Sequence, residues 1–278
     1  MITIGQDNTL TLLRSTSVGL YLGDNTGEEV LLPNKYCPEH FEIGEEITVF
    51  VYRDYAERKI ATTLEPHIKL HEFAFLQVTD VSEVGAFLDW GLEKDLLVPF
   101  REQRQKMEKG RWYVVFLALD ERSYRLFASN KIDKYLSNEE LSVTLHQQVS
   151  LLVSNRSEMG YTVIVNNRHK GLIYANEVFK PLHVGDQLTG YVKNIREDQK
   201  LDISLHPIGY NNFNDANVLK IIQLLEANHG LLNLTDKSDP SEIYALAGMS
   251  KKAFKKAVGA LYKAEKIVLK EDHIALVP

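Results

Sequence analysis

Three basic residues recur at one spacing in the chain, and they are the side chains whose chemistry is easiest to anticipate. Lys59, Arg125 and Lys200 each lie 15 residues after a glycine, and each is followed by an apolar residue. A cation repeated at one position of several segments can contact an anionic partner, whereas a single surface cation is usually only solvated. The pattern favours recognition of an anion.

Groups that would carry catalysis or hold a metal are not clustered in the sequence. The nine histidines are dispersed, and only His67 and His71 have an i,i+4 spacing. The single cysteine, Cys37, has His40 nearby, but a lone surface cysteine is the simpler interpretation. Neither the G-x-x-x-x-G-K-[ST] nor the G-x-G-x-x-G phosphate loop occurs. We therefore expect no enzyme activity, no cofactor and no metal.

Composition bounds the class of protein. The 278 residues include 32 basic and 38 acidic side chains, and the length predicts two or three domains. The longest apolar run, residues 112–119, is far shorter than the ~20 residues that cross a membrane. One cysteine and no visible secretory signal predict a cytoplasmic protein. Residues 1–66 carry 5 basic and 11 acidic side chains, whereas residues 213–278 carry 9 and 8, so an anionic partner should prefer the C-terminal half.

The chain contains three copies of one unit. Each copy has two glycines 25 residues apart, and the pairs are Gly19 with Gly44, Gly85 with Gly110, and Gly160 with Gly185. Short alternating segments follow the glycines, in the third copy at 149–153, 161–165, 171–174, 187–194 and 200–205. Such segments predict small five-stranded barrels in which the first glycine lets the chain bend without a Cβ clash. The expected domains are residues 1–66, 67–144 and 145–209.

After residue 212 the apolar period changes from 2 to about 3.6, which indicates helices. The first helix should begin at Asn214 or Asp215, the second after Asp239 and the third after Ser250. Two short strands, 267–269 and 274–277, should form a hairpin behind the third helix. Residues 213–278 therefore predict a winged-helix domain, and the whole chain is expected to be mainly β with a C-terminal α+β domain.

These motifs resemble a known family. Gly85-Ala86-Phe87-Leu88-Asp89, Lys109-Gly110 and Arg125-Leu126 resemble the S1 RNA-binding domain, a five-stranded OB-fold; the third copy is similar, and the first is the most diverged. Three S1-like units before a winged helix, with SKKAFKKAVGAL at 250–261, resemble the conserved virulence factor B (CvfB) family of bacterial RNA-binding regulators. The resemblance implies a non-enzymatic, cytoplasmic protein that binds single-stranded RNA and affects gene expression.

The resemblance also implies a set of RNA-binding residues. The base-stacking position, two residues after the first glycine, holds Tyr21, Phe87 and Thr162; a second position holds Pro33, Pro99 and Tyr174, and the phosphate-binding cations are Lys59, Arg125 and Lys200. No copy keeps the full family set. The third copy adds the cations Arg168, Lys170, Lys193 and Arg196, and Tyr161 should point into the barrel. We therefore expect the main RNA groove around Tyr174, with Tyr21, Phe87 and the repeated cations as further contacts.

The predicted third helix of the winged-helix domain offers Lys251, Lys252, Lys255 and Lys256, together with Lys263. These lysines are either phosphate contacts or a solvated helix face. Residues 213–278 contain no arginine, which weakens a base-reading role on duplex DNA. We expect a monomer that binds single-stranded RNA; the alternatives are a DNA-binding transcription factor and a protein-binding scaffold.

Overall fold

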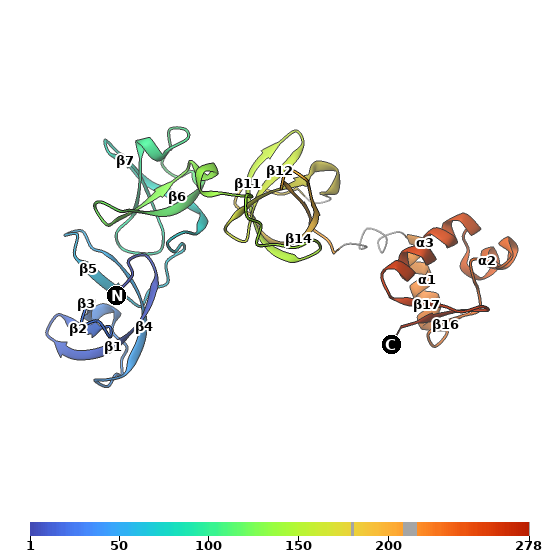
Figure 1. Cartoon of the computed structure of the whole chain (residues 1–278), viewed down its shortest axis with the longest axis horizontal. Helices are drawn as coiled ribbons and strands as arrows, with labels where there is room; N and C mark the ends of the chain where they lie inside the picture. Colours follow the sequence, from blue (N-terminus) through green and yellow to red (C-terminus); the bar gives the residue numbers. More distant parts are fainter. Residues whose placement is uncertain (179–180, 208–215, 278) are drawn as a thin grey trace. The chain divides into compact units, whose positions relative to one another are not determined.

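The structure, a computed structural model, describes residues 1–178, 181–207 and 216–277. It contains three consecutive five-stranded β domains and a helical domain with a small sheet (Figure 1). Backbone contacts divide the chain into two compact units. The first unit comprises Met1–Ser142, Val149–Thr189 and Arg196–Leu201, and the second comprises Val143–Gln148, Gly190–Ile195 and the chain from Asp202 onward. The expected mainly β architecture with a C-terminal winged helix is confirmed.

The first domain is a closed barrel with the strand order β1-β2-β3-β5-β4. Its strands are β1 (Asp7–Thr16), β2 (Gly19–Gly23), β3 (Glu29–Pro33), β4 (Glu46–Arg53) and β5 (Lys59–Thr62). Alternation along β2 and β3 buries Leu20, Leu22, Val30 and Leu32 in the barrel, since successive side chains point to opposite faces. Tyr21, between two of these, stays half-buried on the outside.

The second domain has the same strand sequence, but its sheet is open, whereas a closed barrel was expected. Its strands, in the order β10-β9-β6-β7-β8, are β6 (Phe73–Ser82), β7 (Gly85–Leu88), β8 (Leu96–Pro99), β9 (Trp112–Asp120) and β10 (Arg125–Ser129). In the first barrel β3 and β5 pair in parallel through one residue pair, Leu31 with Ile60. The corresponding strands β8 and β10 are in contact but not hydrogen-bonded as a ladder. A barrel that closes through one parallel pair opens when that pair is lost, although the side-chain core persists.

The third domain is again a closed barrel, and its strands form a ring in Figure 1. They are β11 (Gln148–Ser157), β12 (Gly160–Val165), β13 (His169–Tyr174), β14 (Gln187–Ile195) and β15 (Leu201–Ser204), in the order β11-β12-β13-β15-β14. The strands overlap all five expected segments. Tyr161 is buried, as expected, and Thr162 beside it is half-buried.

A linker before the third barrel is anchored to β13 through the buried side chain of His169. The Nε2 atom of His169 lies 3.1 Å from the backbone N–H of Ser142 and therefore accepts from it. The proton must then sit on Nδ1, which donates to the carbonyl oxygen of Ser137 at 2.6 Å. This arrangement gives both ring nitrogens a hydrogen-bond partner. The anchored linker brings the acidic side chains of Asp133 and Glu140 close to the start of β13.

The C-terminal domain follows the winged-helix pattern. Its elements are α1 (Ala216–Ala227), β16 (Leu231–Leu232), α2 (Pro240–Ala247), α3 (Lys251–Lys263), β17 (Ile267–Leu269) and β18 (Ile274–Leu276). The second and third helices begin after Asp239 and Ser250 as expected, and these two residues cap them by accepting from the N–H groups of Ser241 and Ala253. The expected cap of α1, Asn214 or Asp215, lies outside the described residues. The third strand, β16, pairs with β18 and was not anticipated, because two residues carry no periodicity.

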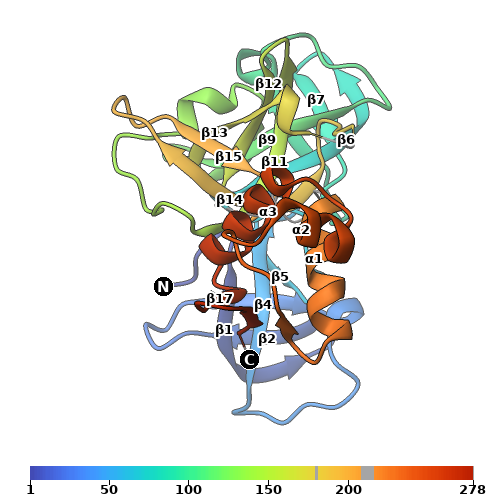
Figure 2. The ribbon, with the colours of Figure 1, turned by 90° about the vertical axis from the view of Figure 1, so that its right-hand side faces the viewer.

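Figure 2 shows the three helices of this domain gathered around one another. Their shared core includes Ile221 and Leu225 of α1, Ile243 of α2, and Phe254 and Leu261 of α3. Because α3 turns its apolar stripe inward, its lysines are left on the outer side.

The glycine that opens the second strand of each β domain is pressed against the third strand. Its φ is +147° at Gly19, +152° at Gly85 and +145° at Gly160. A Cβ atom at these glycines would lie 2.1, 2.2 and 2.0 Å from a carbonyl oxygen of the third strand. Both the dihedral angle and the close approach exclude other residues, which confirms the expected role of this glycine.

We predict that Gly85→Ala destabilises the second domain by about 3 kcal/mol or more, because backbone strain adds to a backbone clash. The matched control is Gly110→Ala in the same domain. Gly110 also has a positive φ, of +80°, but a Cβ there would meet no atom within 4 Å. Gly110→Ala should therefore lower the free energy of unfolding by only about 1 kcal/mol. Urea unfolding of both variants measures the difference, and equal losses would contradict the steric argument.

Candidate nucleic-acid interface

In the first barrel, neighbouring charged side chains already engage both expected RNA contacts, Tyr21 and Lys59. The guanidinium carbon of Arg14 lies 4.2 Å from the ring centroid of Tyr21 and covers it. Arg14 is fixed there by a bidentate ion pair with Glu29, at 2.8 and 2.6 Å. Lys59 forms an ion pair with Glu28. A nucleotide would have to displace these partners before it could use Tyr21 or Lys59.

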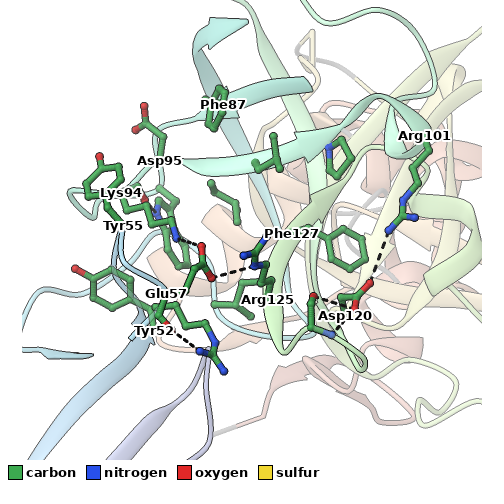
Figure 3. Close-up of a pocket in the computed structure, with 17 residues that line it drawn as sticks. Tyr52, Tyr55, Glu57, Phe87, Lys94, Asp95, Arg101, Asp120, Arg125 and Phe127 are labelled. Atoms are coloured by element: carbon green, nitrogen blue, oxygen red, sulfur yellow. Dashed lines mark hydrogen bonds and ion pairs between the residues drawn. The ribbon is translucent and has the colours of Figure 1, made fainter. Parts of the chain in front are cut away.

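The second domain carries a cavity of about 540 Å³ beside Phe87 (Figure 3). We call it the Phe87 groove. Its wall combines five aromatic side chains with cations, and its principal residues are Tyr52, Tyr55, Glu57, Phe87, Trp90, Lys94, Arg101, Asp120, Arg125 and Phe127. Flat rings beside cations are what single-stranded nucleic acids need for stacking and for phosphate contacts. The structure thus brings together Phe87 and Arg125, two of the residues expected to bind RNA.

Part of the Phe87 groove comes from the first domain. Phe50 and Tyr52 of β4 pack edge-on against the buried Trp90, with ring centroids 5.8 and 6.2 Å apart. This aromatic contact holds the turn between β4 and β5 against the second domain. The turn presents Tyr55, whose side chain is 75% exposed and whose hydroxyl donates to the carbonyl oxygen of Glu93 at 2.8 Å. The groove is therefore a composite of two domains within the first compact unit.

Glu57 occupies the middle of this groove between two cations. Its carboxylate lies 3.0 Å from Nζ of Lys94 and 3.1 Å from Nε of Arg125, as the dashed lines in Figure 3 show. Burial alone would raise the pKa of Glu57, but the hydrogen bond from Lys94 and the charges of Lys94, Arg125 and Arg53 outweigh it, so its pKa is lowered. Glu57 is therefore ionised at neutral pH, and a phosphate must compete with it for Arg125.

A second pair lies at the rim of the groove. Arg101 is 3.7 Å from Asp120, and both side chains are partly exposed. Hydrogen bonds from Ser123 and the charge of Arg101 lower the pKa of Asp120. Arg101 and Phe127, like Lys94 and Tyr55, were not expected to bind RNA. Tyr55 and Glu57 come from the preceding domain, so no spacing within one repeat could have found them.

In the third barrel, the expected residues fall into two groups. Tyr174, at the end of β13, is half-buried, and the guanidinium group of Arg196 contacts its hydroxyl and lies with Cζ 6.0 Å from its ring centroid. Lys200 is on the same hairpin as Arg196, whose backbone N–H donates to the carbonyl of Lys200. Lys200 is exposed, and its hydrogen bond with Asp198 at 2.6 Å lowers the pKa of that carboxyl group. Tyr174, Arg196 and Lys200 are therefore brought together.

Two other cations of this barrel, Lys170 and Arg168, are paired with acidic side chains of the preceding linker. Lys170 is four residues before Tyr174 on β13, or about 13 Å along the strand, and it pairs with Asp133 at 2.7 Å. Arg168 precedes β13 and lies 3.9 Å from Glu140. Lys193 is exposed on β14. The linker acids thus engage Arg168 and Lys170, an arrangement that the repeat could not reveal.

The lysines of α3 differ in exposure. Lys252, Lys255, Lys256 and Lys263 are exposed, and Lys255 lies 3.8 Å from Asp236. Lys251 is partly buried and donates to the backbone carbonyl of Ser238 at 2.8 Å, which makes it a structural contact. The outer side of α3 therefore presents a cationic row suited to phosphates rather than a pocket.

Two negative observations concern the described residues alone. None of their helices is both long and apolar enough to span a membrane. No group of three or more His, Cys, Asp or Glu side chains among them is placed to hold a metal ion.

Known domains and proteins are similar to this chain. The S1 domain model matches residues 4–64, the copy that we expected to be the most diverged, and the CvfB-like winged helix domain model matches residues 219–276. Both domain types are typical of non-enzymatic nucleic-acid-binding proteins. A crystal structure of a multidomain protein with nucleic acid binding domains from Streptococcus pneumoniae aligns over 99% of this chain and 98% of its own, with 24% identity and a TM-score of 0.45.

Full-length relatives are similar over nearly the whole chain. The protein YitL of Bacillus subtilis is 30% identical over 95% of this chain and 90% of its own length. Conserved virulence factor B of Staphylococcus epidermidis is 27% identical over 94% of this chain and 90% of its own. The 30% identity to YitL over nearly the whole chain, the similarity to conserved virulence factor B and the match to the CvfB-like winged helix domain show that the chain belongs to the conserved virulence factor B (CvfB) family.

Proposed function

We propose that the protein binds single-stranded RNA and acts as a non-enzymatic, post-transcriptional regulator in the bacterial cytoplasm. The observation that carries the proposal is the Phe87 groove, where aromatic rings and cations line one cavity of about 540 Å³. Stacking on rings is tolerant of base sequence but needs bases that are not paired in a duplex. A groove of this composition therefore suits a single strand better than a double helix.

We rank the proposed contacts, beginning with those that line the Phe87 groove. The sequence favoured Tyr174 as the main subsite, but because the cavity lies at Phe87, we propose Phe87 and Arg125 as the main subsite and Tyr174 with Arg196 and Lys200 as a second. Lys170, Arg168 and Lys193 follow the backbone, as do the exposed lysines of α3. Tyr21 and Lys59 contribute less, since Arg14 and Glu28 already engage them. We propose that the protein acts as a monomer, because tethered weak subsites on one chain raise the effective concentration of one another.

The first test is a salt series of fluorescence anisotropy titrations with single-stranded RNA, duplex RNA and duplex DNA. We expect tightest binding to the single strand, with log Kd rising linearly with log salt by about 0.7 per phosphate contact. Tighter, sequence-dependent binding of duplex DNA would favour a transcription factor. No binding of single strands at low salt would leave a protein-binding scaffold as the better explanation.

The stacking subsites predict the effect of removing a ring. Phe87→Leu and Tyr174→Leu keep an apolar side chain of similar size but remove the stacking surface. Each should weaken single-strand binding by about fivefold or more, since a stacked base contributes about 1–3 kcal/mol. The matched control is Phe41→Leu, because Phe41 is an exposed ring in the first domain that lines neither cavity described here. Equal effects of all three substitutions, at unchanged melting temperature, would contradict this assignment.

The carboxylate of Glu57 in the Phe87 groove predicts that its removal increases the affinity for single-stranded RNA. Glu57→Gln removes the charge that competes with a phosphate for Arg125 and Lys94, so single-strand binding should tighten by about fivefold. Glu39→Gln changes the net charge equally at an exposed site of the first domain and is the control. If both variants bind RNA with the same affinity, Arg125 is not a phosphate contact.

A further inference from the structure

A second cavity in the first compact unit, of about 430 Å³, lies beside Trp112 at the start of β9. We call it the Trp112 groove. Its lining includes Arg104, Gln105, Arg111 and Trp112 from the second domain and Asn155 of β11 from the third. It shares no lining residue with the Phe87 groove. None of these five residues was expected to bind RNA from the repeat or from the family resemblance.

Trp112 is a half-exposed ring that packs against another aromatic side chain. The ring lies 5.4 Å from the ring of Phe75, centroid to centroid, at an angle of 30°. Gly185 packs closely on Phe75, since a Cβ atom at Gly185 would approach the ring to 2.1 Å. Even so, 51% of Trp112 remains exposed. A ring packed on one side and exposed on the other is an ordered stacking platform, which loses little entropy when it binds.

The charge around Trp112 is positive and accessible. The loop between β8 and β9 carries Arg101, Arg104, Lys106, Lys109 and Arg111 against two acids, Glu102 and Glu108. Arg111 pairs with Glu108 at 2.9 Å, but both side chains are well exposed. Arg104 forms no ion pair with any other described residue. Arg104 thus differs from Arg125 and Lys94 of the Phe87 groove, which Glu57 already holds, whereas Lys109 and Arg101 of the same loop pair with Asp80 and Asp120.

We propose that the Trp112 groove is an additional binding site for one nucleotide of a single-stranded RNA. A base stacks on the exposed part of the Trp112 ring, and Arg104 and Arg111 contact the flanking phosphates. The amides of Gln105 and Asn155 each offer a donor and an acceptor to the edge of the base. The inference rests on the proposed function and adds to it a subsite outside the repeated positions.

This subsite is unique to the second copy of the repeat. The residue two positions after the second glycine is Trp112 there, but Glu46 in the first copy and Gln187 in the third. Neither side chain can stack a base. The groove is thus a property of the junction between the second and third domains rather than of the S1-like unit.

The test compares Trp112→Leu and Trp112→Phe by anisotropy with a short single-stranded RNA of mixed sequence. Trp112→Leu should weaken binding about fivefold or more, and Trp112→Phe should retain most of it, because it keeps a ring. Arg104→Gln should reduce the slope of log Kd against log salt by about 0.7. The control Lys106→Gln makes the same charge change on the same exposed loop, outside the groove lining, and should alter the slope less.

Tryptophan fluorescence supplies an independent readout. The chain has two tryptophans, and Trp90 is only 3% exposed, so stacking of a base should quench mainly Trp112. Titration with RNA should quench the parent protein strongly and the Trp112→Phe variant much less, since the remaining Trp90 lines the Phe87 groove but is buried. If the parent binds RNA and Trp112→Leu binds it with the same affinity, the Trp112 groove is not a subsite, although the proposed function stands. If the folded parent binds no single-stranded RNA, both proposals are wrong.

Discussion

The close approach of one glycine to the neighbouring strand governs the geometry of all three β domains. Because no Cβ fits between Gly19, Gly85 or Gly160 and the opposite carbonyl, the second and third strands pair in one register. That register places each glycine directly opposite Pro33, Pro99 or Tyr174. The residue two positions further along then points outward beside it, since side chains alternate along a strand. A steric constraint in the backbone thus decides which side chains can meet a ligand.

The second glycine of each repeat is hydrogen-bonded to the first strand of its domain. The N–H groups of Gly44, Gly110 and Gly185 each donate at 2.8 Å to the first strand of their domain, at Leu12, Val78 and Val153. In all three domains the register of that strand shifts directly afterwards, as in a β-bulge. Glycine spacing therefore carries the information on both turns, which is why the positions of the strands could be predicted from the sequence. The starts of α2 and α3 could also be predicted from the sequence, because helix capping requires particular side chains at particular positions.

The candidate sites were only partly predictable, and the reason is physical. Repeat spacing identified Phe87 and Arg125, but it could not show that Glu57 of the preceding domain lies between Arg125 and Lys94. Likewise, Lys170 appeared available until the linker placed Asp133 beside it. Trp112 has no equivalent in the other copies, so a search for repeated chemistry passes over it. The open sheet of the second domain was not predicted, because closure of the barrel depends on the geometry of a single strand pair. The amino-acid composition does not show whether that pair forms.

Because many of the candidate cations are paired with carboxylates, their contribution to RNA affinity should be small. An exposed ion pair contributes only about 0–1 kcal/mol, so a phosphate can replace the carboxylate, but the net gain from that exchange is small and falls with salt. Stacking on Phe87, Tyr174 or Trp112 depends much less on ionic strength, because it removes apolar surface from water. No single groove then needs to bind tightly. Affinity for a long strand would arise from several rings used at once on one chain, with the cations setting the path of the backbone between them.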